Sequence, residues 1–516
     1  MGEPVRLAEI IGALSLGVDL GFGQPMEHVL RQCRLALRLA QHLDLGEEQR
    51  GVVYYTALLT NVGCHTDAHE QAKWFGDDIG LKSDKYTYGL HGARSAVAAF
   101  RRIGSGQPLL MRFRVGLSFA LAGHREVDEM IDHHSAMARM LAVELGLPPT
   151  VQAAVGASYE QWDGRGWPGD LRGDSIPVAA RVSQLAKFME VAHRSGGVAE
   201  ATALARKLAG TQFDPEVAEE FARAADTLLS GMDDADTWRA VIADDPVLDR
   251  PLTDEEFDTA LGAVADFVDL KSPYMLGHGR AVAQLVDTAG QRVGLSDDRR
   301  TTLRRAGLAH GLGRLGVSNA IWDKPGPLGA AERERVHLQP YYTERMLRQS
   351  ATLAPIGAIA GQLRERLDGS GYPHGLTGDS IGVEARTLGA ADVYLAMVEP
   401  RPHRPALTPE HAATELRSEA RKGRLDGDAV EAVLVAAGHR SSVRRARPAG
   451  LTVREVEVLR LLIRGLSSKQ IATELVISPK TARNHIEHIY AKTGATSRVT
   501  ASLFALRHGL VTDMPG

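Results

Sequence analysis

Hydrophobic residues recur along most of the chain at intervals of three and four positions. The pattern is clear in LRQCRLALRLAQHL near the N-terminus and in EVEVLRLLIRGL near the C-terminus. This spacing places apolar side chains on one face of an α-helix, whereas few segments show the alternation of a β-strand. The pattern therefore predicts a mainly α-helical protein.

Length and composition limit the possible architectures further. A chain of 516 residues is too long for one hydrophobic core, because a domain holds roughly 150 residues. A hydrophobic content of 44% and a net charge of -4 are typical of an ordinary globular protein. There is neither an apolar run of roughly 18 residues nor a secretory pattern, and only two cysteines, Cys33 and Cys64, are present. We expect a cytoplasmic protein without a membrane partner.

The N-terminal part of the chain contains an internal repeat. WDGRGWPGDLRGDSIPVAARV, from Trp162, matches LDGSGYPHGLTGDSIGVEART, from Leu367, without a gap at an offset of 205 positions. Gly, Pro and Asp between helical segments are typical of a fixed loop, because Gly permits positive φ and Pro stiffens a turn. Two copies of this loop predict two copies of one domain.

The repeat divides the chain into five predicted segments. They are a diverged first copy at 1–229, a linker at 230–251, a second copy at 252–438, a basic linker at 439–450 and a C-terminal domain at 451–516. The first copy carries an insertion, because 73 positions separate Thr60 from His133 but only 29 separate His310 from Gln339.

The C-terminal segment carries the capping signals of a helix-turn-helix. Thr452 and Glu455 form a capping box for one helix, and Ser478 followed by Pro479 starts another. The string LTVREVEVLRLLIRGLSSKQIATELVISPKTARNHIEHIYAKTGATSRVTA resembles the LuxR-type DNA-binding domain of transcription regulators. The resemblance implies a four-helix domain that binds double-stranded DNA; the alternative is a helical bundle that binds only protein.

The helix after Ser478 is the predicted recognition helix, since such helices enter the major groove. Arg483 suits guanine and Asn484 suits adenine, whereas Glu487 either accepts from cytosine or weakens binding. The predicted DNA-contacting residues are Lys469, Lys480, Thr481, Arg483, Asn484, Glu487 and Lys492. An apolar stripe of Val499, Leu503 and Leu506 on the final helix predicts a homodimer.

The second copy also resembles a known family. Its loop DGSGYP, with DLKSPYMLGHGRAVA, AHGLGRLGVSNAIWDKPGPL, PYYTERML and AADVYLAM in the family's order, resembles the bacterial HD-GYP phosphohydrolases. The resemblance implies a helical domain that hydrolyses cyclic di-GMP with two or three metal ions. Its ligands would be a His, a His-Asp pair, a later His, a His-His pair and a late Asp, with a Lys near the first pair.

Both copies depart from this ligand pattern. The second copy keeps His278, His310 and Asp392, but Gly311 stands where the bridging carboxylate belongs. The other replacements in the second copy are Arg314, Gln339, Leu363 and Arg364. The first copy keeps His28 and His133, and its replacements are Thr60, Asn61, Ser158, Tyr159 and Lys187.

These losses predict two catalytically degenerate domains without catalytic residues or a cofactor. No metal is expected at the remnant positions His28, His133, His278, His310 and Asp392. Such domains would serve as sensor, nucleotide-binding or dimerisation modules of a transcription regulator, or as a protein scaffold. The alternative is a metal-dependent cyclic di-GMP phosphodiesterase, or another phosphohydrolase, with an attached DNA-binding domain.

The residues at and around the ligand positions of the second copy, called the second cleft below, are the candidate site for an effector. Arg314, Arg364 and Tyr372, with His278, His310 and Asp392, would surround a cyclic dinucleotide or another nucleotide, because Arg binds phosphate through two parallel hydrogen bonds. The competing interpretation is that the remaining histidines are hydrogen-bonded core residues.

The string CHTDAHE of the first copy is a further candidate. Cys64, His65, Asp67 and His69 are residue types that bind zinc. The string matches no zinc motif, so a polar loop beside the cleft is the favoured interpretation.

Overall fold

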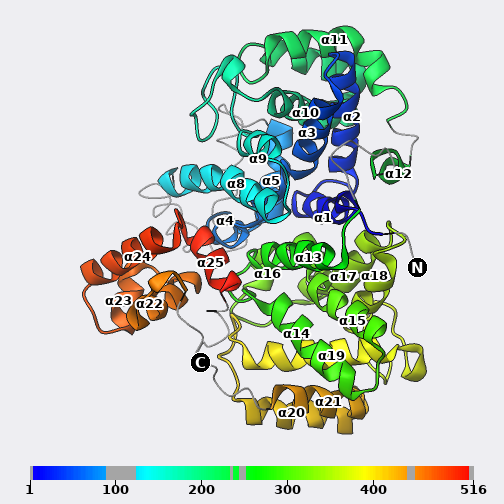
Figure 1. Ribbon diagram of the computed structural model, residues 1–516, viewed down its shortest axis with the longest axis vertical. Coiled ribbons are helices and arrows are strands. Elements are labelled where there is room, and N and C mark those ends of the chain that lie inside the picture. Colours follow the sequence, from blue (N-terminus) through cyan, green and yellow to red (C-terminus); the bar gives the residue numbers. More distant parts are fainter. Residues whose placement is uncertain are drawn as a thin grey trace. The chain divides into compact units, whose positions relative to one another are not determined.

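The computed structural model describes residues 4–88, 124–232, 236–242, 251–438, 448–508 and 510. Among these residues the regular elements are helices and none is a strand, which confirms the mainly α-helical prediction (Figure 1). No helix in these ranges combines the length and the apolar character that crossing a bilayer requires. The chain forms two compact units, Met1–Ala263 with Leu315–Ala320, and Val264–Arg314 with Ile321–Gly516.

The first unit is built around the pair α2 and α10. α2 buries one face, including Leu30, Cys33 and Leu39, against α3 and α10. The helices of this unit are α1 (Leu7–Gly21), α2 (His28–His42), α3 (Glu47–Leu59), α4 (Ala68–Phe75), α5 (Asp78–Tyr88), α8 (His124–Glu144), α9 (Pro149–Gly156), α10 (Val178–Leu208), α11 (Pro215–Leu229) and α12 (Thr237–Ile242). The predicted insertion begins with α4 and α5, and much of the rest of it lies outside the described residues.

The second unit repeats this order. Its helices are α13 (Asp254–Asp269), α14 (His278–Arg292), α15 (Asp297–Ala309), α16 (Asn319–Trp322), α17 (Ala330–Leu347), α18 (Ala354–Gly361), α19 (Val383–Val398), α20 (Pro409–Arg421) and α21 (Gly427–Ala437). α14 packs on α15 and α19, as α2 packs on α3 and α10. The division between the units falls within α13, and the predicted linker at 230–251 stays a prediction.

The repeated loop has the same internal bonding in both copies. The Glu160 carboxylate accepts hydrogen bonds from the backbone amides of Gly169 (3.2 Å) and Leu171 (3.2 Å). The Glu365 carboxylate accepts from the amides of His374 (2.7 Å) and Leu376 (2.8 Å). The loop also contains a cis Trp-Pro bond in the first copy and a cis Tyr-Pro bond in the second. The shared loop sequence therefore encodes a shared scaffold.

The C-terminal segment forms four short helices, as predicted. They are α22 (Val453–Ile463), α23 (Ser468–Glu474), α24 (Pro479–Thr493) and α25 (Arg498–Arg507). Thr452 and Glu455 form the predicted capping box, with the Glu455 amide donating to Thr452 Oγ1 at 3.2 Å. Ser478 caps α24 by accepting from the Thr481 amide at 3.0 Å.

Candidate functional sites

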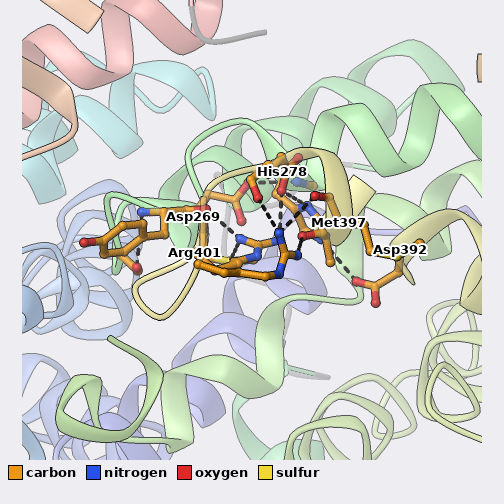
Figure 2. A network of polar contacts seen from close by, with 12 residues as sticks. Asp269, His278, Asp392, Met397 and Arg401 are labelled. Atoms are coloured by element: carbon orange, nitrogen blue, oxygen red, sulfur yellow. Dashed lines mark hydrogen bonds and ion pairs between the residues drawn. The ribbon is translucent and has the colours of Figure 1, made fainter. Parts of the chain in front are cut away.

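The second cleft begins where α14 begins. Gly277 has a positive φ of 78°, which turns the chain so that His278 opens the helix, and the Asp269 carboxylate accepts from the Gly279 amide at 2.8 Å. His278 Nε2 lies 3.1 Å from Asp392 Oδ1, and its Nδ1 lies 2.8 Å from Glu399 Oε2 (Figure 2). Burial alone would lower the pKa of His278, but these two carboxylates raise it. His278 is therefore held by acids from both sides.

His310 has a different environment at the end of α15. Its Nδ1 lies 2.6 Å from the Gly307 carbonyl oxygen, which fixes a proton on Nδ1. Its Nε2 then accepts a hydrogen bond from Arg314 Nη2 at 2.9 Å. Burial, and next the Arg314 charge, lowers the pKa of His310 to about 3, so the imidazole is neutral at pH 7.

Arg314 occupies the space beside the missing carboxylate. Its side chain is 5% exposed, and Nη1 pairs with Asp269 Oδ1 at 3.1 Å. A Cβ atom added at Gly311 would lie 3.2 Å from the same Nη1. A side chain at position 311 would therefore need the guanidinium to shift slightly.

Asp392 is the acidic centre of the cleft. Its Oδ2 pairs with Arg364 Nη1 at 2.8 Å, and its Oδ1 lies 3.6 Å from His310 Nε2. Burial alone would raise the pKa of Asp392, but Arg364 and His278 hold it well below its usual range. Asp392 is therefore an ionised, buried carboxylate.

The expectation of no cofactor is wrong, because these residues form a potential metal site. The ligand atoms of His278, His310 and Asp392 lie within 4.8 Å of one another, and all three residues are buried. Two imidazole nitrogens and one carboxylate oxygen suit a divalent transition metal. A bound ion would compete with Arg314 for the lone pair of His310 Nε2, because that nitrogen already accepts a hydrogen bond.

Other predicted residues surround this centre without joining it. Gln339 Nε2 donates to the backbone carbonyl of His310 at 2.8 Å, so its amide supports the helix end. Tyr372 is half-buried and its ring stacks on His337, with 3.9 Å between ring centroids. Leu363 is buried among apolar side chains of the core.

The sequence interpretation missed Asp269, Glu399 and Arg401. Arg401 pairs with Glu399 at 2.8 Å and donates to the Tyr274 carbonyl oxygen at 2.6 Å, which links the segment after α19 to the start of α14 (Figure 2). Arg401 lies outside the strings that carry the resemblance, and only its proximity to Glu399 in the sequence offered a signal.

The matching positions of the first copy, called the first cleft below, have the same scaffold but different chemistry. His28 Nδ1 lies 2.5 Å from Glu190 Oε2, and Arg31 pairs with the same carboxylate at 2.7 Å. Lys187, at the position of Asp392, is buried with its ammonium 5.0 Å from the centre of the Tyr159 ring. A lysine ammonium repels cations, so this cleft lacks the acidic centre of the second.

The histidine of α8 that enters the first cleft is His134 rather than His133. A Cβ at Gly63 would lie 1.9 Å from the His134 carbonyl oxygen, and a Cβ at Gly313 would lie 1.9 Å from that of Gln339. His134 therefore corresponds to Gln339, and it is buried whereas His133 is half-buried. The expected remnant role of His133 is wrong, because the insertion obscured which neighbour occupies the inner face.

The first part of the string CHTDAHE, from Cys64 to Ala68, is buried. Cys64 is 1%, His65 3% and Asp67 3% exposed. Cys64 Sγ lies 3.3 Å from His134 Nδ1, and His134 Nε2 lies 2.9 Å from Asp67 Oδ2. Because the sulfur and the carboxylate approach opposite ring nitrogens, they do not share one metal position with His134.

The predicted recognition helix presents polar side chains to solvent. Ala482 and Ile489 are buried in the domain interior. The exposed members of the predicted DNA-contacting set are Lys469, Lys480, Thr481, Arg483, Asn484, Glu487 and Lys492. Lys492 also pairs with buried Glu455 at 2.7 Å, so it fastens α24 to the start of α22. DNA contact by these residues stays a prediction.

The apolar stripe expected to form a dimer is largely unavailable. Leu503 and Leu506 are each 5% exposed, and α25 packs against α22 and α24. Two of the three stripe residues therefore serve the interior, and a homodimer through this stripe is not supported.

Comparison with known proteins agrees with this architecture. The family model described as "HD domain" matches residues 123–217 and 262–429, and the model "Bacterial regulatory proteins, luxR family" matches 449–505. A 3'3'-cGAMP-specific phosphodiesterase 3 of Vibrio cholerae is 32% identical over 407 residues, which cover 78% of this chain and 88% of the relative. The chain belongs to the HD-domain family. It also carries a luxR-family domain.

Two further relatives give the scale of the similarity. A cyclic di-GMP phosphodiesterase response regulator of Xanthomonas campestris is 33% identical over 156 residues, covering 30% of this chain and 41% of that protein. The crystal structure of a cyclic GMP-AMP specific phosphodiesterase of V. cholerae matches with a TM-score of 0.59 and 26% identity, covering 85% of this chain and 99% of that one. The two family models confirm both parts of the recognised architecture, the HD domain and the luxR-type domain.

Proposed function

We propose that this HD-domain protein is a transcription regulator that binds a cyclic dinucleotide in its second cleft without hydrolysing it. The observation that carries the proposal is Arg314, whose guanidinium takes the lone pair of His310 Nε2 and pairs with Asp269. Hydrolysis in such domains relies on several metal ions, whereas the residues of this cleft offer ligands for one.

Recognition of a cyclic dinucleotide is supported by charge and by the relatives. The related phosphodiesterases act on 3'3'-cGAMP or cyclic di-GMP, both of which carry two phosphodiester groups. Arg364 is 23% exposed and uses Nη1 to pair with Asp392. Its guanidinium carries further N–H donors, which suit a phosphate oxygen. Asp392 thus orients Arg364 toward the ligand.

The ligand claim is tested by calorimetry with full-length protein and 3'3'-cGAMP or cyclic di-GMP. We expect Arg364→Ala to weaken binding by about tenfold or more, as loss of a charge-assisted hydrogen bond does. Arg348→Ala, at an exposed arginine of the same unit, is the matched control and should bind normally. No binding of either dinucleotide by the wild type would contradict the claim.

The DNA-binding claim rests on the capped, exposed helix α24. Arg483→Ala should cost about 1 to 3 kcal/mol at a preferred site and relax base preference, because a bidentate base contact is lost. Lys480→Ala should weaken all sequences alike and flatten the salt dependence. Selection from random duplexes followed by gel shifts measures both effects. No enriched motif, with unchanged binding by Arg483→Ala, would contradict base reading by α24.

A second candidate function is supported by the triad of His278, His310 and Asp392. A metal ion held there would polarise a phosphate and activate water, so the chain would act as a phosphodiesterase. Chromatography of 3'3'-cGAMP incubated with protein and Mn²⁺ separates the two candidates. Turnover by the wild type that disappears in His310→Ala would favour the enzyme over the sensor.

A further inference from the structure

The first cleft contains a thiol with the partners of an activated nucleophile. Cys64 Sγ lies 3.3 Å from His134 Nδ1 and 2.7 Å from the Tyr159 hydroxyl, and Asp67 Oδ2 lies 2.9 Å from the other nitrogen of His134. The negative charge of Asp67 beside Nε2 stabilises a positively charged His134, so that the imidazole can take the proton of the thiol through Nδ1. This is the order of acid, imidazole and nucleophile that activates hydroxyl and thiol groups in catalysis.

The three residues come from separate parts of the fold. Cys64 lies in the short turn Val62–His65 after α3, Asp67 precedes α4, and His134 lies on α8. α8 packs on that turn, and Gly63 permits the approach because a Cβ there would collide with the His134 carbonyl oxygen at 1.9 Å. The close packing therefore fixes the imidazole beside the sulfur.

The other cysteine supplies an internal reference. Cys33 is fully buried in α2, its Sγ lies 3.6 Å from the Tyr54 carbonyl oxygen, and burial raises the pKa of its thiol. A carbonyl oxygen accepts a hydrogen bond but is not a base for a thiol. The two cysteines thus have similar burial and different neighbours.

We propose that Cys64 is a peroxide-reactive thiol activated by His134 and Asp67. The proposal is independent of the proposed function of the second cleft. Cys64 is 1% exposed, which excludes large substrates, so the oxidant that we assign is the small neutral molecule hydrogen peroxide.

The reaction is a two-electron oxidation of sulfur. The Cys64 thiol gives its proton to His134 Nδ1, and the sulfur attacks one oxygen of hydrogen peroxide. The O–O bond breaks, an S–O bond forms, and the departing hydroxide takes the proton from His134 and leaves as water. Cys64 becomes a sulfenic acid while the peroxide is reduced. The Tyr159 hydroxyl can donate a hydrogen bond to the thiolate before the attack.

The test treats the native full-length protein with hydrogen peroxide, quenches the reaction, denatures the protein in the presence of a sulfenic-acid trap, and quantifies both cysteine peptides by mass spectrometry. We expect Cys64 to be oxidised at least about tenfold faster than Cys33, because general-base activation contributes that factor or more. This comparison needs no variant. Equal rates for the two native cysteines, or no oxidation of Cys64, would overturn the proposal.

Variants assign the activation to the imidazole. His134→Gln should slow oxidation of Cys64 at least about tenfold while the rate at Cys33 is unchanged, and Asp67→Asn should slow it less. Circular dichroism and thermal melting identify variants that keep the native fold. If His134→Gln melts like the wild type and Cys64 still reacts at the wild-type rate, the activating role of His134 is excluded.

Discussion

The two clefts share one scaffold and differ almost completely in chemistry. In both, a carboxylate that precedes the helix α2 or α14 accepts a backbone hydrogen bond, Asp19 from Val29 and Asp269 from Gly279. In the second cleft Arg314 pairs with Asp269. In the first cleft the position that matches Arg314 is occupied by Cys64. Burial raises the pKa of Asp19 well above its usual range. The loop and helix caps therefore preserve the fold, while the interior side chains are free to diverge.

The largest expected effect concerns the buried pair of the second cleft. Arg314→Met should destabilise the protein by about 3 to 5 kcal/mol, because it leaves the Asp269 carboxylate buried without its cation. Urea unfolding measures the change. The matched variant Asp19→Asn in the first cleft should cost less than about 1 kcal/mol, since burial raises the pKa of Asp19 and so favours its neutral form, which asparagine resembles. Equal costs in the two clefts would remove this distinction.

A second effect concerns the pH dependence that His310 gives to the second cleft. Its pKa in the folded protein, about 3, is below the ordinary value of 6.5, so the folded state favours the neutral imidazole. Its contribution to stability is present above pH 6.5 and is lost as the pH falls toward 3. The stability advantage of the wild type over His310→Gln should shrink by about 2 kcal/mol between pH 7 and pH 5. A constant difference would show that His310 is not held neutral.

The smallest effect concerns the residue immediately before α2 and the residue immediately before α14. Glu27 and Gly277 both have positive φ, 76° and 78°, but only glycine adopts this conformation without strain. Glu27→Gly should stabilise the protein by about 1 kcal/mol, and Gly277→Ala should destabilise it by a similar amount. Thermal melting of the two variants checks the opposite signs. Shifts of the same sign would contradict the matched geometry.

The sequence was sufficient for the helices, the repeat and the four-helix C-terminal domain, because these depend on local periodicity and capping residues. It also identified His278, His310 and Asp392, which the fold brings together. The expectation that no metal binds was wrong, because a count of the lost ligands does not show that the three remaining ones lie close together. That convergence depends on packing between α14, α15 and α19.

Two other errors have the same physical origin. Adjacent histidines of α8 point in different directions, so His133 and His134 could not be distinguished while the insertion hid the register. Leu503 and Leu506 have the spacing of an external stripe, but an interior face of a small helix has the same spacing. Periodicity identifies an apolar face and does not say what covers it.

Above all, we propose that the second cleft binds a cyclic dinucleotide and leaves it intact. The most direct measurement incubates full-length protein with 3'3'-cGAMP and Mn²⁺ and follows, in one sample, bound and hydrolysed nucleotide. We expect saturable binding that Arg364→Ala weakens, with all of the nucleotide recovered unchanged. Linear products formed by the wild type but not by His310→Ala would contradict it.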